Sequence, residues 1–156
     1  MVEPPTGEED SLTAPDITTL VADIRSQYPD CFACGPDNPV GLHIDPGEMD
    51  EGEAVATFRP GEHHAGAGDT LHGGLAATVL DEIMVWAGIL AERVLSVTGK
   101  MDLRFLRPVS VSDNIVLRGR VDERSGRRLR CSGELMVDGE KAVTAGGLYL
   151  VVRSFE

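Results

Sequence analysis

The chain has 156 residues, a hydrophobic content of 42% and a formal net charge of -12. This length suits a single domain with one core, so a second independent fold is not expected. The acidic surplus leaves no diffuse cationic surface, which argues against nucleic acid or anionic lipid as a partner.

The start of the chain differs in composition from the rest. Residues 1–16 contain three prolines and five acids but no base, and they lack apolar periodicity. We therefore predict a disordered acidic tail there. Apolar residues then recur at helical spacing and predict a short helix over residues 17–27, which opens a single folded domain over 17–156.

The cysteines indicate a reducing compartment. Cys31, Cys34 and Cys131 make an odd count, and the first thirty residues hold no apolar signal segment, so a cytoplasmic location is expected. The spacing of Cys31 and Cys34 is that of a zinc knuckle, but a closed site needs four ligands and no second pair follows. Because only His43 or Cys131 could contribute further, no metal is expected.

Strand patterns follow on both sides of one long apolar segment. Residues 40–44 alternate apolar and polar, and residues 53–59 are rich in small and β-branched side chains, so both are predicted strands. After the apolar segment, residues 100–106 place Met101, Leu103 and Phe105 on one face and Asp102 and Arg104 on the other. Three further strands, over 114–121, 128–137 and 141–152, form a meander whose last turn is Asp138-Gly139.

The apolar segment itself, LHGGLAATVLDEIMVWAGIL (71–90), has the density of a buried helix. It carries Asp81 and Glu82 side by side, and two adjacent carboxylates at mid-bilayer argue against a membrane span. A helix that is apolar on nearly all sides must be covered on nearly all sides. The fold class predicted is therefore α+β, with about six antiparallel strands curled around one long central helix.

The chain resembles a known family in two stretches, LHGGLAATVLDE (71–82) and GKMDLRFLRPV (99–109). Both are similar to the hotdog-fold acyl-CoA thioesterases of the phenylacetate-pathway type, within the 4-hydroxybenzoyl-CoA thioesterase superfamily. The upstream segment CFACGPDNPVGLHI (31–44) is similar to the leader of one bacterial branch. The resemblance covers roughly residues 31–152 and is most specific at His-Gly-Gly followed by the acid.

This resemblance implies more than the residues alone can. It implies two protomers that form one continuous sheet, as a homodimer or a dimer of dimers, with sites at the subunit interface. It also implies hydrolysis of an acyl-CoA to a free acid and CoA, with no metal or organic cofactor. A non-catalytic acyl-CoA or fatty-acyl binding protein on the same scaffold is the alternative.

The glycines at the start of the helix can support thioester chemistry. A backbone N-H at a helix N-terminus supplies a donor and the positive end of the dipole where a carbonyl oxygen becomes anionic. Gly73 and Gly74 lack side chains, so a substrate can approach them closely, and we expect Gly74 to supply the donor. Alternatively, the pair merely permits a tight turn. His72 either orients this loop or forms a hydrogen bond near the thioester carbonyl, or it is an ordinary residue at a helix start.

Either of the two acids is a candidate general base or nucleophile. Asp81 follows Gly74 by seven residues and lies within about 20° of the same helix face, whereas Glu82 lies about 80° away. The family uses the position of Asp81 in many members and that of Glu82 in one branch. We favour Asp81 and expect Glu82 to be a structural carboxylate, but the presence of both leaves the assignment open.

Distance along the helix predicts a shared site. Seven residues span about 10 Å, so one protomer's Gly74 and its own Asp81 would be strained to serve one thioester. We therefore expect Gly74 from one subunit to act with Asp81 from the other. The resemblance adds Thr98, which would help to place the water; as a β-branched residue it also suits a strand without any such role.

Basic residues cluster between positions 100 and 130, which hold nine of the fourteen lysines and arginines. The cluster is either a solvated sheet face or a local site for an anionic ligand. CoA carries several phosphate charges that arginine can bind with two hydrogen bonds. Arg104 and Arg107, nearest the helix in sequence, are the candidates, while the acyl group stays unassigned.

Overall fold

The structure, a computed structural model, describes residues 16–46 and 48–155. The predicted tail lies outside this part of the chain except for Asp16, which is the N-cap of the first helix. In chain order the elements are α1 (Ile17–Gln27), β1 (Glu48–Asp50), β2 (Glu53–Phe58), the 3-10 turn η1 (Glu62–His64), α2 (Gly73–Glu92), β3 (Val94–Phe105), β4 (Ile115–Ser125), β5 (Arg128–Val137) and β6 (Glu140–Ser154).

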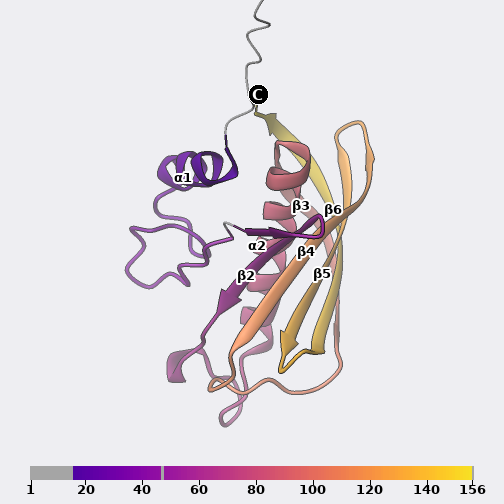
Figure 1. The fold of residues 1–156 in the computed structure, drawn as a ribbon. Coiled ribbons are helices and arrows are strands. Elements are labelled where there is room, and N and C mark those ends of the chain that lie inside the picture. The colour runs from indigo at the N-terminus through magenta and orange to yellow at the C-terminus, as the bar shows by residue number, and fades with distance from the viewer. Residues whose placement is uncertain (1–15, 47, 156) are drawn as a thin grey trace, which may run out of the picture.

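The six strands form one antiparallel sheet in the order β1-β2-β4-β5-β6-β3. The sheet curls along α2, and α1 stands on the other side of that helix (Figure 1). This arrangement is the hotdog fold, and the predicted α+β class is confirmed. Because β3 pairs only with β6, it is an edge strand whose outer backbone groups face away from the sheet.

Helix α2 is the centre of the core. Val79, Leu80, Ile83, Met84 and Trp86 are each at most 1% exposed, because the sheet covers one side of the helix and the N-terminal segment covers much of the other. By length and composition alone the helix could cross a membrane, yet 56% of its apolar window is buried inside the fold. It is thus packed as the core helix of a globular domain.

Two glycines let α2 approach the sheet closely. Gly119 of β4 is paired with Gly133 of β5. A Cβ atom on Gly119 would lie 2.5 Å from the carbonyl oxygen of Ile83, and one on Gly133 would lie 3.2 Å from Cγ of Met84. The backbone of the helix therefore rests directly on the sheet near Ile83, two residues after Asp81.

The predicted strand over residues 40–44 is wrong. Leu42 and Ile44 are buried, as the alternation indicated, but their N-H groups donate to the carbonyl oxygens of Phe32 (2.8 Å) and Ala33 (2.9 Å) in the preceding loop. His43 between them has a φ of 51°, which no strand adopts. The alternation reflects a loop packed over the core. Both helices and the other five predicted strands are confirmed, but β3 begins at Val94, six residues before the predicted start, and β1 was not predicted.

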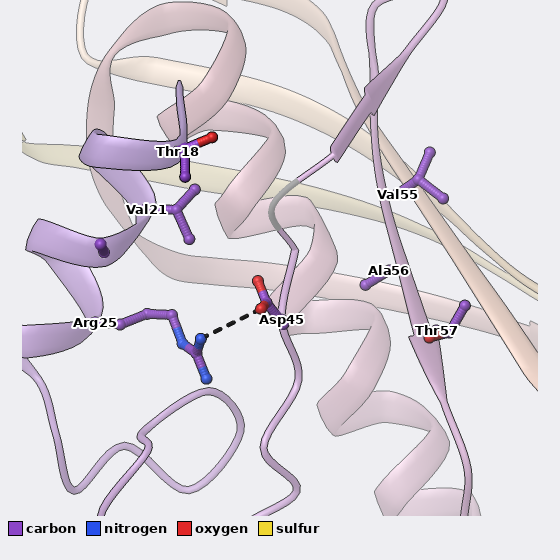
Figure 2. Close-up of a pocket in the computed structure, with 8 residues that line it drawn as sticks. Thr18, Val21, Arg25, Asp45, Val55, Ala56 and Thr57 are labelled. Carbon is purple, nitrogen blue, oxygen red and sulfur yellow. Dashed lines mark ion pairs between the residues drawn. The ribbon is translucent and has the colours of Figure 1, made fainter. Parts of the chain in front are cut away.

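Helix α1 joins this loop to the body of the domain. Leu20, Val21 and Ile24 are buried in the main core. A cavity of about 480 Å³ lies between α1 and β2, and the ion pair of Arg25 with Asp45 spans it at 3.5 Å (Figure 2). The N-terminal segment is therefore held to the domain by apolar packing as well as by charge.

Candidate active site

The start of α2 is capped by a side chain. Nδ1 of His72 accepts a hydrogen bond from the N-H of Gly74 at 2.9 Å, and the carbonyl of His72 accepts from Leu75 and Ala76. Within the part of the chain that the structure describes, the N-H of Gly73 donates to no group. The donor expected at Gly74 is therefore occupied, and Gly73 offers the free one. The cause is the N-cap geometry, in which the capping side chain reaches the second helical N-H but not the first.

Gly73 opens onto an apolar cavity. The ring of Phe105 lies 3.6 Å from where a Cβ atom on Gly73 would be. The cavity has a volume of about 410 Å³. Its lining is Thr70, Leu71, Gly73, Ala76, Phe105, Leu106, Arg107, Pro108, Val109 and Val143. The free N-H thus lies beside a space that an apolar group can occupy.

Asp81 is held by two hydroxyl groups. Oγ1 of Thr98 and the hydroxyl of Tyr149 both donate to Oδ1 of Asp81, at 2.6 Å and 2.9 Å. Thr98, which the family resemblance predicted to help place the water, thus lies in direct contact with Asp81. Among the described residues, no group donates to Oδ2, so this oxygen is available to a ligand or a water. The carboxylate is oriented through one oxygen and left open at the other.

Tyr149 was missed by reasoning from the sequence. It lies on β6 directly opposite Thr98 and is fully buried. Burial raises the pKa of its hydroxyl, and the charge of Asp81 raises this pKa further, so the group stays a protonated donor. A Cβ atom on Gly147 would lie 2.5 Å from the tyrosine ring. The sequence did hold one signal for the position of Tyr149. Gly147 precedes it by two residues on the same strand, so the two share a face, and the glycine leaves room there for the ring.

Glu82 has different surroundings from its neighbour. Its Oε1 accepts a hydrogen bond from Nε1 of Trp86 at 2.7 Å, and ligand atoms of Cys31 and Cys34 lie within 4.8 Å of its carboxylate. Burial raises the pKa of the Glu82 carboxyl. The two adjacent acids therefore face separate sites. Asp81 faces β3 and β6, whereas Glu82 faces the N-terminal loop, the segment after α1 that carries Cys31 and Cys34.

Comparison with known proteins identifies the domain. Residues 68–144 match the model of the thioesterase superfamily. This range holds Gly73, Asp81 and Thr98, and the fold around it is the hotdog fold. This match to the thioesterase superfamily covers just under half of the chain.

Individual relatives place this thioesterase-superfamily domain among known structures. Acyl-coenzyme A thioesterase 13 of Homo sapiens is 32% identical over 71 residues, which is 45% of this chain and 51% of that protein. The match thus spans about half the length of that relative. The PaaI protein of E. coli, from the phenylacetic acid degradation operon, has a TM-score of 0.72 and 18% identity, covering 88% of this chain and 97% of that chain.

A second solved structure is a protein of Streptococcus mutans bound to acetyl CoA. Its TM-score is 0.66 at 15% identity, covering 72% of this chain and 91% of that chain. At this level of identity, the two solved structures show that the hotdog fold is shared.

The two candidate arginines of the thioesterase-superfamily domain lie apart. Arg107 lines the cavity beside Gly73, and its guanidinium is bound to Oε2 of Glu140 at 2.5 Å and to the carbonyl of Val137 at 3.2 Å. Arg104 lies on the other face of β3, because its neighbours Leu103 and Phe105 point toward α2. The structure thus brings Arg107 and Gly73 together but not Arg104.

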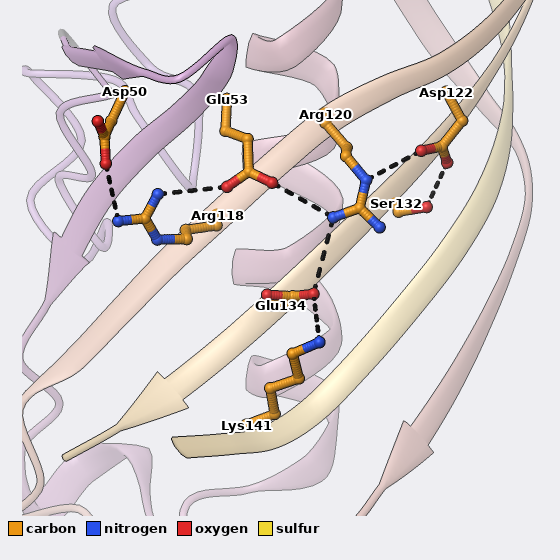
Figure 3. Close-up of polar contacts among 8 residues, drawn as sticks. All are labelled: Asp50, Glu53, Arg118, Arg120, Asp122, Ser132, Glu134 and Lys141. Atoms are coloured by element: carbon orange, nitrogen blue, oxygen red, sulfur yellow. Dashed lines mark hydrogen bonds and ion pairs between the residues drawn. The ribbon is translucent and has the colours of Figure 1, made fainter. Parts of the chain in front are cut away.

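Two members of the basic cluster, Arg118 and Arg120, form ion pairs on the outer face of the sheet. Arg118 binds Asp50 and Glu53 at 3.0 and 3.2 Å, and Arg120 binds Glu53 at 3.3 Å (Figure 3). The same network continues through Asp122, Ser132, Glu134 and Lys141. Of the two interpretations of this cluster, the solvated face fits these residues, because exposed pairs of this kind contribute only about 0–1 kcal/mol each.

Proposed function

We propose that the chain hydrolyses an acyl-CoA thioester to a free acid and CoA. The observation that carries this proposal is the pair of features on α2: a free N-H at Gly73, and a carboxylate at Asp81 that Thr98 and Tyr149 hold through one oxygen. The match of residues 68–144 to the thioesterase superfamily supports the reaction, and the human relative that is named an acyl-coenzyme A thioesterase supports the class of substrate.

In this mechanism the thioester oxygen accepts a hydrogen bond from Gly73. The N-H and the positive end of the helix dipole stabilise the negative charge that develops on this oxygen during attack. Asp81 acts through its open oxygen, either by taking a proton from the attacking water or by attacking the carbonyl carbon itself. In the first case the proton taken from water passes to the sulfur of CoA, which leaves as the thiol, and the acyl group leaves as the acid. In the second case the sulfur leaves first, and a water then hydrolyses the anhydride between Asp81 and the acyl group.

The site requires two protomers. Gly73 and Asp81 are eight residues apart on α2, a rise of about 12 Å, whereas a reacting carbon must lie about 3 Å from both of its partners. We propose that the edges of two β3 strands pair into a continuous sheet, as a dimer or a dimer of dimers. Val97 on β3 is 49% exposed, and Phe105 is 56% exposed, so the edge also offers apolar side chains to a partner.

The acyl group is placed in the apolar cavity beside Gly73. Leu71, Ala76 and Val143 in its lining suit an apolar chain or ring. Arg107, which lines the same cavity, is the candidate partner for a phosphate of CoA. In this role Arg107 would exchange its bond to Glu140 for a bond to the substrate.

A thiol-release screen over a panel of aryl, short-chain and medium-chain acyl-CoAs tests the proposal. Wild type, Asp81→Asn and Glu82→Gln are compared side by side. We expect Asp81→Asn to lower kcat about 10²- to 10⁴-fold, the usual contribution of a positioned acid or base, and Glu82→Gln to keep most of the activity.

The opposite ranking would transfer the role to Glu82. Binding of the acyl-CoAs without any release of thiol by the wild type would instead favour the non-catalytic binding protein.

A further inference from the structure

A second cluster of reactive side chains lies on the other side of α2 from Asp81's partners. The sulfur atoms of Cys31 and Cys34 and a carboxylate oxygen of Glu82 all lie within 4.8 Å of one another. Cys34 is buried, while Cys31 and Glu82 are partly exposed, so the cluster is reachable from solvent. Two thiols and one acid from two separate elements converge on one point.

The loop is built to keep the two sulfurs together. The N-H of Gly35 donates to the carbonyl of Cys31 at 2.8 Å and closes a tight turn around both cysteines. A Cβ atom on Gly35 would lie 2.4 Å from the backbone nitrogen of Cys31 and from the carbonyl oxygen of Pro29, so only glycine fits. The turn is therefore preorganised, and little ordering remains to be done when a ligand binds.

We propose that Cys31, Cys34 and Glu82 bind a thiophilic divalent cation, with Zn²⁺ the best match. Two thiolates and a carboxylate are the donor types that Zn²⁺ accepts, and three protein ligands leave a fourth tetrahedral position open. A cavity of about 130 Å³ borders all three residues. A water needs about 30 Å³, so the cavity has room for one as the fourth ligand.

Neighbouring groups orient these ligands. Nε1 of Trp86 donates to Oε1 of Glu82 at 2.7 Å, which fixes the carboxylate and leaves its other oxygen for the cation. Nε of Arg25 donates to the carbonyl of Cys34 at 3.0 Å and holds the loop against α1. Hydrogen bonds of this kind, one shell outside the ligands, are typical of metal sites.

Cation binding displaces protons from this cluster. Cysteine and glutamate bind a cation through the thiolate and the carboxylate, so each ligand must be deprotonated in the complex. Each ligand gives up its proton to the solvent as its bond to the cation forms. Affinity for the cation must therefore increase with pH.

The bound cation would tie the N-terminal loop to α2 at Glu82, the residue next to Asp81. The inference does not depend on the proposed hydrolysis, because it rests on a different set of side chains and predicts a different observable. A cation held there would stabilise the loop that covers this side of the helix.

Titration of the reduced, metal-stripped full-length chain with Co²⁺ tests the site. Thiolate bonded to Co²⁺ gives a charge-transfer absorption band in the near ultraviolet. We expect one Co²⁺ per chain with this band, displacement of the Co²⁺ by Zn²⁺, and weaker binding as the pH is lowered. Thiol titration before the addition of metal establishes that the cysteines are reduced.

Variants assign the ligands. We expect Cys31→Ser and Cys34→Ser to lose the thiolate band and Glu82→Gln to weaken binding at least tenfold, with the fold checked by circular dichroism. Cys131→Ser is the matched control, because Cys131 is a buried thiol in a different cluster, and it should bind Co²⁺ like the wild type. Should Cys34→Ser fail to fold, the partly exposed Cys31 still gives the test.

The site is refuted by a reduced wild-type protein that shows no thiolate band. It is equally refuted by a band that survives loss of Cys31, or by unchanged affinity in Glu82→Gln. None of these results bears on thioester hydrolysis, which the thiol-release screen measures separately.

Discussion

Asp81 is oriented by hydrogen bonds. Among the described residues its two donors are hydroxyl groups, and both bind one oxygen, so the side chain gains a fixed direction without an ion pair to a described residue. Glu82, one residue later, is enclosed with Trp86 and a thiol. Two acids in consecutive positions thus have different environments because successive residues of a helix point about 100° apart.

Tyr149→Phe tests the orientation of Asp81. The substitution removes one donor and keeps the ring that packs over Gly147, so we expect the fold to be retained. A hydrogen bond to a charged group contributes about 1.5–3 kcal/mol, which corresponds to a loss of about 10- to 100-fold in kcat. Steady-state thiol release, with thermal unfolding alongside, measures both effects.

Thr98→Ser is the companion variant, because it keeps a hydroxyl group for Asp81 and should stay close to wild type. Full activity in Tyr149→Phe would mean that Thr98 alone is sufficient to orient the carboxylate.

The sequence was sufficient for some of these residues and not for others. Asp81 and Thr98 could be found because they lie close to a recognisable motif. Gly74 was the predicted donor, but the structure shows its N-H bound to His72 and leaves that of Gly73 free, and this difference depends on where the His72 ring points. Tyr149 lies 68 residues after Asp81, and no local pattern predicts which strand returns to cover the helix.

At the scale of elements, the contact between α2 and the sheet depends on Gly119. A methyl group there meets the carbonyl of Ile83 at 2.5 Å, and a backbone group cannot swing aside as a side chain can. We expect Gly119→Ala to reduce the free energy of unfolding by about 3 kcal/mol, the upper range for overpacking in a core. Urea unfolding followed by circular dichroism measures the loss.

Gly146→Ala is the matched control on the same sheet. The nearest atom to its new methyl group is 4.0 Å away, so this variant should unfold at nearly the wild-type urea concentration. Equal losses in the two variants would show that β-strand conformation, and not contact with the helix, is responsible.

Apolar periodicity predicted the elements well wherever a strand or helix buries one side. The Asp138-Gly139 turn was also predictable, and both residues have positive φ, as a two-residue hairpin turn requires. The same periodicity failed over residues 40–44. Leu42 and Ile44 are buried alternately there too, but their hydrogen-bond partners come from a loop and not from a strand.

At the scale of the whole molecule, a site shared between protomers predicts complementation. Gly73→Pro removes the free N-H at the first helical position, where proline is tolerated, and should cost about 10²- to 10³-fold in kcat. Asp81→Asn disables the other half of the site. A dimer that combines the two variants contains one site with an intact Gly73 and an intact Asp81.

Mixing the two inactive proteins in equal amounts under conditions of subunit exchange should therefore restore about a quarter of wild-type activity, since half of the dimers are mixed and each has one working site. The same mixture without exchange is the control. If exchange is demonstrated by mass spectrometry and no activity returns, each protomer must use its own Gly73 and Asp81.

The direct packing of α2 on Gly119 also limits where the preference for one acyl group over another can be changed. No side chain stands between helix and sheet at that point, so there is nothing there to enlarge or trim. If the cavity beside Gly73 holds the acyl group as proposed, Leu71, Phe105 and Leu106 in its lining are the residues to change for a longer or wider group. Under the proposed function, Asp81 and the choice of acyl group could then be varied independently, because they depend on different parts of the fold.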